Sequence, residues 1–324
     1  MTGLEIMAYQ LDRRSRAERL AHLDAPELRR RGVEAARDLD PENLWALVEA
    51  YLVLRGGSGG RISDHTLRAY KFGLLLLLEW ARPAGMSFLS PRPNQGSAYI
   101  RWLESRPLNP ATVKNRLTAA RTVFAALRWT GATDAAPFAD VRSAPDPVPV
   151  HQKRSPYPEA DLQVLLAAAD MQTQVVILLG AHLGLRVSEM VALRRSEVFL
   201  NERQPRLVVE RGKGGKRREV SISRSAQAAL ERWMNATPQL TEYVLSWRST
   251  RNVDRQLEAL CERTGIRYDH RHVHGLRHSA GTRVYKATGD LLEVRDHLGH
   301  ADISTSERYV HHARADKPAV NRDW

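Results

Sequence analysis

Hydrophobic residues recur at spacings of three and four positions along most of the chain, which predicts a mainly helical fold. In the first half, this pattern indicates a compact bundle of four helices joined by short loops. The first helix is expected to open at Pro41 and to end at the glycine-rich segment 56–60, and the second is expected to be capped by Ser63. The third and fourth are expected over residues 96–104 and 111–129.

The second half of the chain carries further helical patterns and one segment of a different kind. The helices are expected at residues 159–168, 172–183, 187–193, 225–236, 251–264, 276–287 and 293–297. Between them, residues 206–210 and 219–222 are alternating, β-branched runs on either side of a basic, glycine-rich turn, which predicts a β-hairpin. The expected fold class is mainly α: an N-terminal helical bundle, then a mainly helical domain with a small β-hairpin or sheet.

Changes in composition divide the chain into four parts. Residues 1–40 are rich in Arg, Asp and Ala, and are expected to form a basic N-terminal extension, either an arm or an extra helix. The helical bundle follows over residues 41–145. Closely spaced prolines and a basic pair then mark an extended linker over residues 146–156, and the second domain is expected over residues 157–324.

The charge of the chain indicates a polyanionic partner. The formal net charge is +12 and the isoelectric point is about 10.2, and nucleic acid is the commonest partner of so basic a protein. Solubility alone and an anionic membrane surface are the alternatives. The aliphatic run from Leu74 to Leu78 is far too short to span a membrane, and no apolar signal core follows Glu5. The single cysteine, Cys261, allows no internal disulfide, which fits a reducing cytoplasm, and it is expected in the core.

Six residues in the second half form a set suited to chemistry on a phosphodiester. They are Arg186, Lys213, His274, Arg277, His300 and Tyr309. Arginines grip non-bridging phosphate oxygens with paired N–H donors. A lysine can protonate a leaving alkoxide, histidines can move or donate protons, and a tyrosine can attack phosphorus and become esterified.

The order and spacing of these residues resemble the tyrosine recombinase family, of the Xer and phage-integrase type. His300 follows Arg277 by 23 positions and precedes Tyr309 by nine, as in Xer-type recombinases. The flanking words Gly-Leu-Arg-Val-Ser-Glu, Gly-Lys-Gly-Gly-Lys-Arg, His-Gly-Leu-Arg-His and Leu-Gly-His-Ala-Asp-Ile-Ser-Thr-Ser also resemble the family's signatures. The close resemblance covers residues 155–312, about half of the chain.

The resemblance implies a role for each member of the set. Tyr309 would be the nucleophile that forms a 3′-phosphotyrosyl link. Arg186 and Arg277 would neutralise the phosphoryl group, with help from His274 and His300. The general acid would be Lys213, with Lys216 as its competitor on the same turn. Glu189 would orient the phosphate-binding groups. No cofactor is required, because the bond energy is kept in the phosphotyrosine.

The resemblance also implies an assembly and a setting. The bundle would be the core-binding, SAM-like domain of the family. The active form would be a homo-tetramer, or a hetero-tetramer with a paralogue, on two sites in double-stranded DNA, and strands would exchange through a Holliday junction. Resolution of chromosome or plasmid dimers and integration of a mobile element are the expected roles. A DNA translocase is an expected partner, and the expected location is the cytoplasm, at the nucleoid.

Basic residues outside the catalytic set are expected to contact DNA. They are Lys114, Arg116 and Arg121 in the last helix of the bundle, Lys153 and Arg154 in the linker, and Lys216 in the hairpin turn. For the residues in the bundle, a solvated helix face is the alternative interpretation.

Simpler interpretations remain open at several of these positions. Arg186 and Glu189 lie three positions apart and could form only a local ion pair. The histidines within residues 269–278 invite a zinc site, although no cysteine or carboxylate lies at a typical ligand spacing. Two other functions share the fold: a type IB topoisomerase-like enzyme, and a catalytically silent DNA-binding protein.

Overall fold

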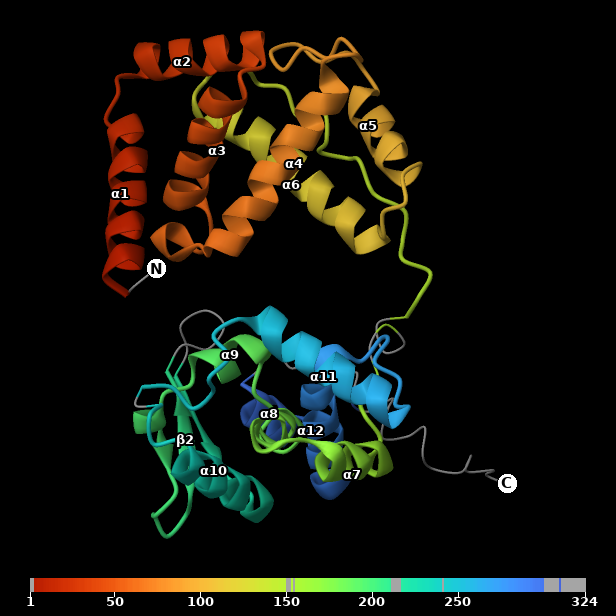
Figure 1. The fold of residues 1–324 in the computed structure, drawn as a ribbon. Helices are drawn as coiled ribbons and strands as arrows, with labels where there is room; N and C mark the ends of the chain where they lie inside the picture. Colours follow the sequence, from red (N-terminus) through yellow and green to blue (C-terminus); the bar gives the residue numbers. More distant parts are fainter. Residues whose placement is uncertain are drawn as a thin grey trace. The chain divides into compact units, whose positions relative to one another are not determined.

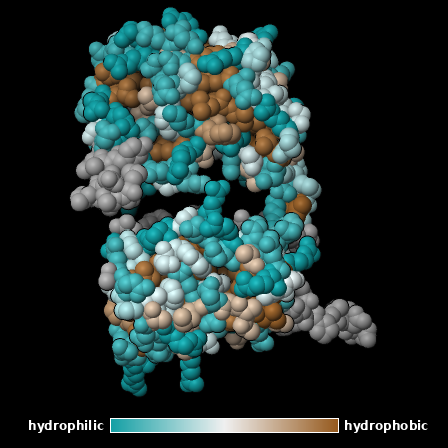
Figure 2. All heavy atoms as spheres, in the orientation of Figure 1, coloured by the Kyte–Doolittle hydropathy of each residue, from teal (hydrophilic) through white to brown (hydrophobic). Residues whose placement is uncertain are grey.

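The computed structural model has two compact units, Met1–Pro147 and Val148–Trp324 (Figure 1). It describes residues 3–149, 153, 155–210, 217–240, 242–299 and 309, with side chains from residue 12 onward. Both units are mainly helical, and the second contains a small antiparallel sheet, which confirms the expected fold class. The surface shown in Figure 2 is largely hydrophilic, with apolar patches on the N-terminal unit.

The N-terminal unit consists of α-helices and one short 3-10 turn, η1. They are α1 Gly3–Ala21, α2 Ala25–Asp38, α3 Pro41–Arg55, η1 Gly59–Arg61, α4 Asp64–Ala81, α5 Gln95–Glu104 and α6 Pro110–Trp129. The expected cap at Ser63 is confirmed, because its hydroxyl accepts a hydrogen bond from the backbone N–H of Thr66. Asp40 caps α3 in the same way, accepting from the N–H groups of Glu42 and Asn43.

Close packing of helices forms the core of this unit. A Cβ placed on Gly73 of α4 would lie 2.4 Å from the Cβ of Ala119 on α6, so glycine lets these two helices approach closely. The rings of Phe88, Phe124 and Phe138 pack against one another with centroids 5.3 and 5.6 Å apart. These contacts fix α6, the helix that carries three of the expected DNA contacts.

Residues 1–40, expected as a basic extension, hold two helices whose side chains reach the core. Ala17 of α1 and Ala35 and Ala36 of α2 are buried in it. Arg13 of α1 is 1% exposed, and it donates a hydrogen bond to the carbonyl of Ile62 and forms an ion pair with Asp64 at the start of α4. The first helix is thus attached to the bundle by a buried charge.

The C-terminal unit is built around α8, a helix with few polar residues. The helices are α7 Glu159–Ala168, α8 Met171–Ala181, α9 Val187–Ala192, α10 Arg224–Ala236, α11 Thr250–Thr264, α12 His272–Thr288 and α13 Leu291–Leu298, with a 3-10 turn η2 at Arg195–Glu197. α8 packs between α10 and α12. Cys261 of α11 is fully buried, as expected.

One helix begins earlier than its apolar pattern indicates. α12 starts at His272, four positions before the expected start at Leu276. The histidine-rich segment has too few apolar residues to show helical periodicity, but Val273 is buried in the core and holds the first turn in place. The helix begins from a tight turn, since His270 and His272 have positive φ values of 62° and 51°.

The sheet contains the predicted hairpin and one further short strand. Its strands are β1 Val198–Phe199, β2 Arg206–Val209 and β3 Arg218–Ser221, in the order β1-β2-β3, all antiparallel. The sequence did not reveal β1, because two residues are too few to show an alternating pattern. In the described part of the chain, no helix is both long and apolar enough to cross a membrane.

We predict that the buried arginine of α1 stabilises the N-terminal unit far more than its exposed neighbour does. Arg13→Met should lower the free energy of unfolding of this unit by about 2 kcal/mol, because it leaves the part-buried carboxylate of Asp64 without its cationic partner. Arg14→Met is the matched control, since Arg14 is 70% exposed and forms a surface pair with Glu18, so about 0.5 kcal/mol or less is expected. Hydrogen exchange at the amides of α3 measures both effects. Equal protection in the two variants would contradict the prediction.

Candidate active site

One face of α12 carries the residues from which the candidate site is built. His274, Arg277, His278 and Gly281 are spaced so that they lie together along the helix. The rings of His274 and His278 pack edge to face with centroids 4.6 Å apart, and the ring of His278 lies 5.7 Å from that of Tyr309. His278, one of the histidines of the segment 269–278, therefore stands between the predicted histidine and the predicted nucleophile.

Arg277 is a buried cation held by backbone carbonyls. It is 1% exposed, and its two terminal nitrogens donate hydrogen bonds to the carbonyls of Gly184 and Leu298, the latter at 2.7 Å. Burial lowers the pKa of Arg277 to about 9, and the nearby charge of Arg186 adds to this effect. The side chain therefore remains positive at neutral pH, and its position is fixed by the loop after α8 and by the end of α13.

Arg186 is the N-cap residue of α9, at the end of the loop that contains Gly184. Its backbone N–H donates to Oε2 of Glu189 at 2.9 Å, and its Nη1 donates to Oε1 of the same carboxylate at 2.7 Å. The Arg186 side chain is 21% exposed, so a ligand that approaches the unit can reach it. Gly184, which precedes it, has φ +68°, and a Cβ there would lie 2.4 Å from Leu298. Glycine thus allows the Gly-Leu-Arg segment to lie against the end of α13.

Glu189 is shared between two arginines. Its side chain is 2% exposed, and Nη1 and Nη2 of Arg218 donate to its two oxygens at 3.0 and 2.7 Å. Burial acts to raise the pKa of Glu189, but hydrogen bonds and charge from Arg218, and then from Arg186, outweigh it and lower the pKa to about 2. The local Arg186–Glu189 ion pair weighed from the sequence does form, as part of a larger cluster.

Arg218 is the site residue that the sequence analysis missed. It lies on β3, beyond the basic turn, among several other arginines that look equivalent in the sequence. The pleat of the strands distinguishes Arg218 from its neighbours. The register pairs Leu207–Val220 and Val209–Arg218 lie on the same, buried face of the hairpin. Its position two residues before Val220, on the strand face that carries buried valines, is the feature that could have identified Arg218 in the sequence.

Tyr309 is buried beside the arginine of α12. It is 1% exposed and packs with Ala280, Val294 and Leu298. A Cβ on Gly281 would lie 2.6 Å from the tyrosine ring, so glycine makes room for it on the face of α12. Tyr309 also lies close enough to Arg277 to influence the pKa of that guanidinium.

Most of the remaining predicted residues, two catalytic and the others DNA contacts, fall on segments that the structure does not describe. Lys213 and Lys216 in the hairpin turn, His300 after α13, and Arg154 in the linker all lie outside the described residues. Lys153 is described and is partly exposed. The roles of these residues stay predictions.

The three predicted DNA contacts of α6 have different surroundings. Lys114 is exposed. Arg116 donates to the carbonyl of Ala69 at 3.1 Å, and its guanidinium stacks 4.3 Å from the centre of the Phe72 ring. Arg121 donates to the carbonyl of Val141 at 2.7 Å and also to Phe138. Both arginines therefore support their own domain, and contact with DNA is a prediction for all three.

No metal site forms among the residues that the structure describes. There, no group of three or more His, Cys, Asp or Glu side chains lies close enough to hold an ion. Within the histidine-rich segment, the ring of His272 packs against Tyr268 with centroids 4.8 Å apart.

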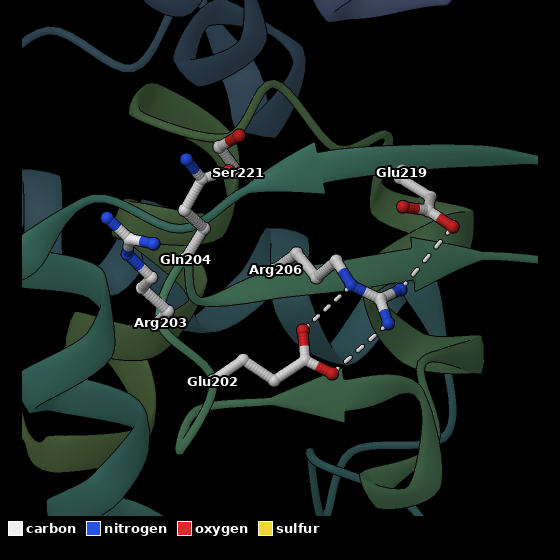
Figure 3. Close-up of a pocket in the computed structure, with 6 residues that line it drawn as sticks. All are labelled: Glu202, Arg203, Gln204, Arg206, Glu219 and Ser221. Atoms are coloured by element: carbon white, nitrogen blue, oxygen red, sulfur yellow. Dashed lines mark hydrogen bonds and ion pairs between the residues drawn. The ribbon is translucent and has the colours of Figure 1, made fainter.

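A separate cavity lies on the outer face of the sheet (Figure 3). It has a volume of about 500 Å³ and is lined by Glu202, Arg203, Gln204, Arg206, Glu219 and Ser221. Arg206 pairs with Glu202 at 2.9 Å and with Glu219 at 3.4 Å, so the charges in this cavity largely neutralise one another. It is a polar surface feature on the face of the hairpin opposite to Arg218.

Comparison with known proteins identifies the family. Residues 158–316 match the model of the phage integrase family, and residues 58–131 match that of the phage integrase N-terminal SAM-like domain. The tyrosine recombinase XerC of Xanthomonas campestris pv. campestris is 31% identical over 264 residues, which cover 78% of this chain and 80% of the relative. The tyrosine recombinase XerC of Pseudomonas aeruginosa is 30% identical over 263 residues, which cover 78% and 85%.

Solved structures share the fold. The XerH site-specific recombinase bound to palindromic difH substrate has a TM-score of 0.64 at 18% identity, covering 83% of this chain and 80% of that one. The Tn1549 transposon integrase in complex with transposon right end DNA has a TM-score of 0.66 at 15% identity, covering 84% and 97%. The chain belongs to the tyrosine recombinase, or phage integrase, family. It is a tyrosine-type site-specific recombinase that acts on DNA.

We predict that Glu189 gives the C-terminal unit a pH-dependent stability. Because its pKa is lowered from 4.5 to about 2, its contribution is complete above about pH 4.5 and is lost as the pH falls toward 2. Glu189→Gln should therefore cost on the order of 3 kcal/mol at pH 7, and the difference from the native protein should shrink between pH 4.5 and 2.

Thermal or urea unfolding across this pH range measures the difference. Glu197→Gln is the matched control, because Glu197 also accepts from a backbone N–H, that of Arg194, but on an exposed turn. About 1 kcal/mol or less is expected for it. A Glu189→Gln difference that is the same at pH 7 and pH 2.5 would show that the carboxylate charge is unimportant.

Proposed function

We propose that the chain exchanges DNA strands through a covalent 3′-phosphotyrosyl intermediate carried by Tyr309. The phenolic oxygen attacks the scissile phosphorus, the bond from phosphorus to the 5′ oxygen breaks, and that oxygen takes up a proton to leave as a hydroxyl. A 5′ hydroxyl from the partner duplex then attacks the phosphotyrosine and releases the tyrosine. The number of phosphate ester bonds is unchanged, so neither step requires ATP.

The observation that carries this proposal is the convergence of Arg186, Arg277 and Tyr309. They come from the N-cap of α9, from α12 and from the segment beyond α13. Arg186 and Tyr309 are both close enough to Arg277 to influence its pKa. A phenol beside one cation, with a second cation close to the first, is suited to hold a phosphodiester next to its nucleophile.

The geometry of the cations suits a transition state that gains negative charge. Arg277 is already fixed by the carbonyls of Gly184 and Leu298, so it needs little rearrangement when the pentacoordinate phosphoryl group forms. Arg186 is partly exposed, so it forms the solvent-facing side of the pair of arginines that would bind the phosphate. His274 on the same face of α12, and His300, would assist by donating hydrogen bonds to the phosphate.

The general acid in this scheme is Lys213. It lies in the turn between β2 and β3, and β3 is anchored beside the arginines through Arg218. We propose that the lysine approaches the leaving 5′ oxygen from the hairpin side. Lys216 on the same turn is its competitor.

The assembly follows from the need to exchange two duplexes. We infer a tetramer on two DNA sites, of this chain alone or with a paralogue, that passes through a Holliday junction. Two related solved structures support DNA-bound assemblies: a lambda integrase dimer is bound to a COC′ core site, and XerH is bound to difH substrate. Lys114, Arg116, Arg121, Lys153, Arg154 and Lys216 are proposed to contact the DNA backbone.

The biological role is proposed at the level of two alternatives. The sequence relatives are XerC recombinases, which favours resolution of chromosome or plasmid dimers, with a DNA translocase as partner. Structural neighbours include a transposon integrase, which keeps integration of a mobile element as the second role. Both place the protein at the nucleoid. The DNA sequence to which it becomes linked in cells distinguishes them.

Tyr309→Phe should abolish the covalent adduct while leaving the fold and DNA binding intact. The change removes one hydroxyl from a packed ring, so the packing against Gly281 is retained. Denaturant-stable protein–DNA complexes on a nicked duplex that carries the recombination site measure the effect. Tyr285→Phe is the matched control, because Tyr285 packs against the same small cluster and should still allow adduct formation. An adduct formed by Tyr309→Phe would exclude Tyr309 as the nucleophile.

Lys213→Ala should slow cleavage strongly when the leaving group is an ordinary 5′ hydroxyl. A bridging 5′-thio substrate should restore the rate, since a thiolate leaves without protonation. The measurement is single-turnover cleavage of the two substrates by Lys213→Ala and by Lys216→Ala. If only Lys216→Ala is rescued by sulfur, Lys216 is the acid instead.

A further inference from the structure

Among the hairpin arginines that the structure describes, which are Arg206, Arg217 and Arg218, Arg218 is the one directed into the site. Strand residues alternate between faces, and Arg218 shares a face with Val220, which is 3% exposed. Its register partner Val209 is also buried. Its neighbour Arg217 is instead 57% exposed and pairs with Glu210 and Glu219. The pleat therefore directs the Arg218 side chain toward the interior and leaves the Arg217 side chain at the surface.

Two parts of the candidate site are in contact with the Arg218 side chain. Its terminal nitrogens donate to both oxygens of Glu189, and the guanidinium side chain is 12% exposed. Its stem lies against Gly299, where a Cβ would be 2.6 Å from Cδ of Arg218. Gly299 has φ +63° and ends α13 immediately before His300. The side chain therefore lies between α9 and the turn that leads to the predicted histidine.

The charges of this cluster do not balance. The charges of Arg186 and Arg218 both act to lower the pKa of Arg277, and the nearby carboxylate of Glu189 acts to raise it. Among the described residues, Glu189 is the carboxylate that pairs with Arg186 and Arg218. With Arg186 and Glu189 alone, the exposed arginine would be neutralised by a full ion pair. With Arg218 present, one carboxylate is divided between two guanidinium groups, and positive charge remains for an anion.

We propose that Arg218 is a positioning residue for strand cleavage, acting through Glu189. It holds the carboxylate in the orientation that fixes Arg186, and it takes a share of the carboxylate's charge so that Arg186 keeps its attraction for the scissile phosphate. The same contact anchors the base of the hairpin turn, on which Lys213 lies five positions earlier. This inference rests on the proposed phosphotyrosyl chemistry and adds to it a residue that does not touch the DNA.

A double-mutant cycle tests this. Arg218→Met should slow single-turnover cleavage of a nicked duplex by about 10- to 100-fold, because Arg186 loses its orientation. DNA affinity should change by no more than about twofold. Glu189→Gln should slow cleavage as well, and Arg218→Met added to Glu189→Gln should have almost no further effect, because interacting residues are not additive. Arg218→Lys should recover only part of the rate, since an ammonium cannot make the two parallel bonds.

Arg206→Met is the matched control. Arg206 lies on β2 of the same sheet, pairs with Glu202 and Glu219, and is on the outer face (Figure 3). It carries the same loss of charge, and cleavage should be unchanged. Thermal unfolding of every variant shows which of them fold. The double variant removes both charges of the pair, so its comparison with Glu189→Gln still tests whether Arg218 acts through the carboxylate if Arg218→Met alone is unstable.

Two results would overturn the proposal. Additive effects in the Glu189→Gln background would show that Arg218 does not act through the carboxylate. A loss of DNA affinity as large as the loss of cleavage would show that Arg218 contacts the phosphate itself. Failure of the proposed function is separable, because it would appear as a native protein that forms no adduct.

Discussion

One buried carboxylate sets the charge balance on which the candidate site depends. Glu189 accepts hydrogen bonds from the backbone and guanidinium of Arg186 and from both terminal nitrogens of Arg218. Without it, the cations beside Arg277 would face one another in a poorly solvated space, and a buried charge without a partner is strongly destabilising. With it, the cluster is stable in the free protein and still carries excess positive charge. The site is therefore prepared for an anion before the anion arrives.

Backbone geometry brings distant segments of the chain to this cluster. Arg277 ties α12 to the end of α13 and to the loop after α8 through hydrogen bonds to the carbonyls of Leu298 and Gly184. Glycine is needed where these segments meet: Gly184 adopts a left-handed conformation against Leu298, and Gly281 leaves space for the ring of Tyr309. The nucleophile and the phosphate clamp are consequently positioned by the same contacts that hold the helices together.

The sequence predicted the fold class and the hairpin well, because helical periodicity and strand alternation are local signals. It could not predict the start of α12, which depends on burial of Val273, or β1, which is too short to show a pattern. Their order and spacing in the sequence predicted that Arg186, Glu189, Arg277 and Tyr309 belong to one site, and the structure places them in one region. Arg218 was missed because the direction of its side chain depends on the register of β3. Likewise, only three-dimensional packing shows that Arg121 donates to carbonyls of its own domain.

The most direct test is to identify the residue that carries DNA. Protein–DNA complexes formed in cells would be isolated under denaturing conditions, digested with nuclease and protease, and analysed by mass spectrometry. The account predicts a peptide with a 3′-linked nucleotide on Tyr309, and attached DNA fragments that share one short sequence. Nucleotide linked to another residue, or no linked peptide from cells in which the protein recombines DNA, would contradict it.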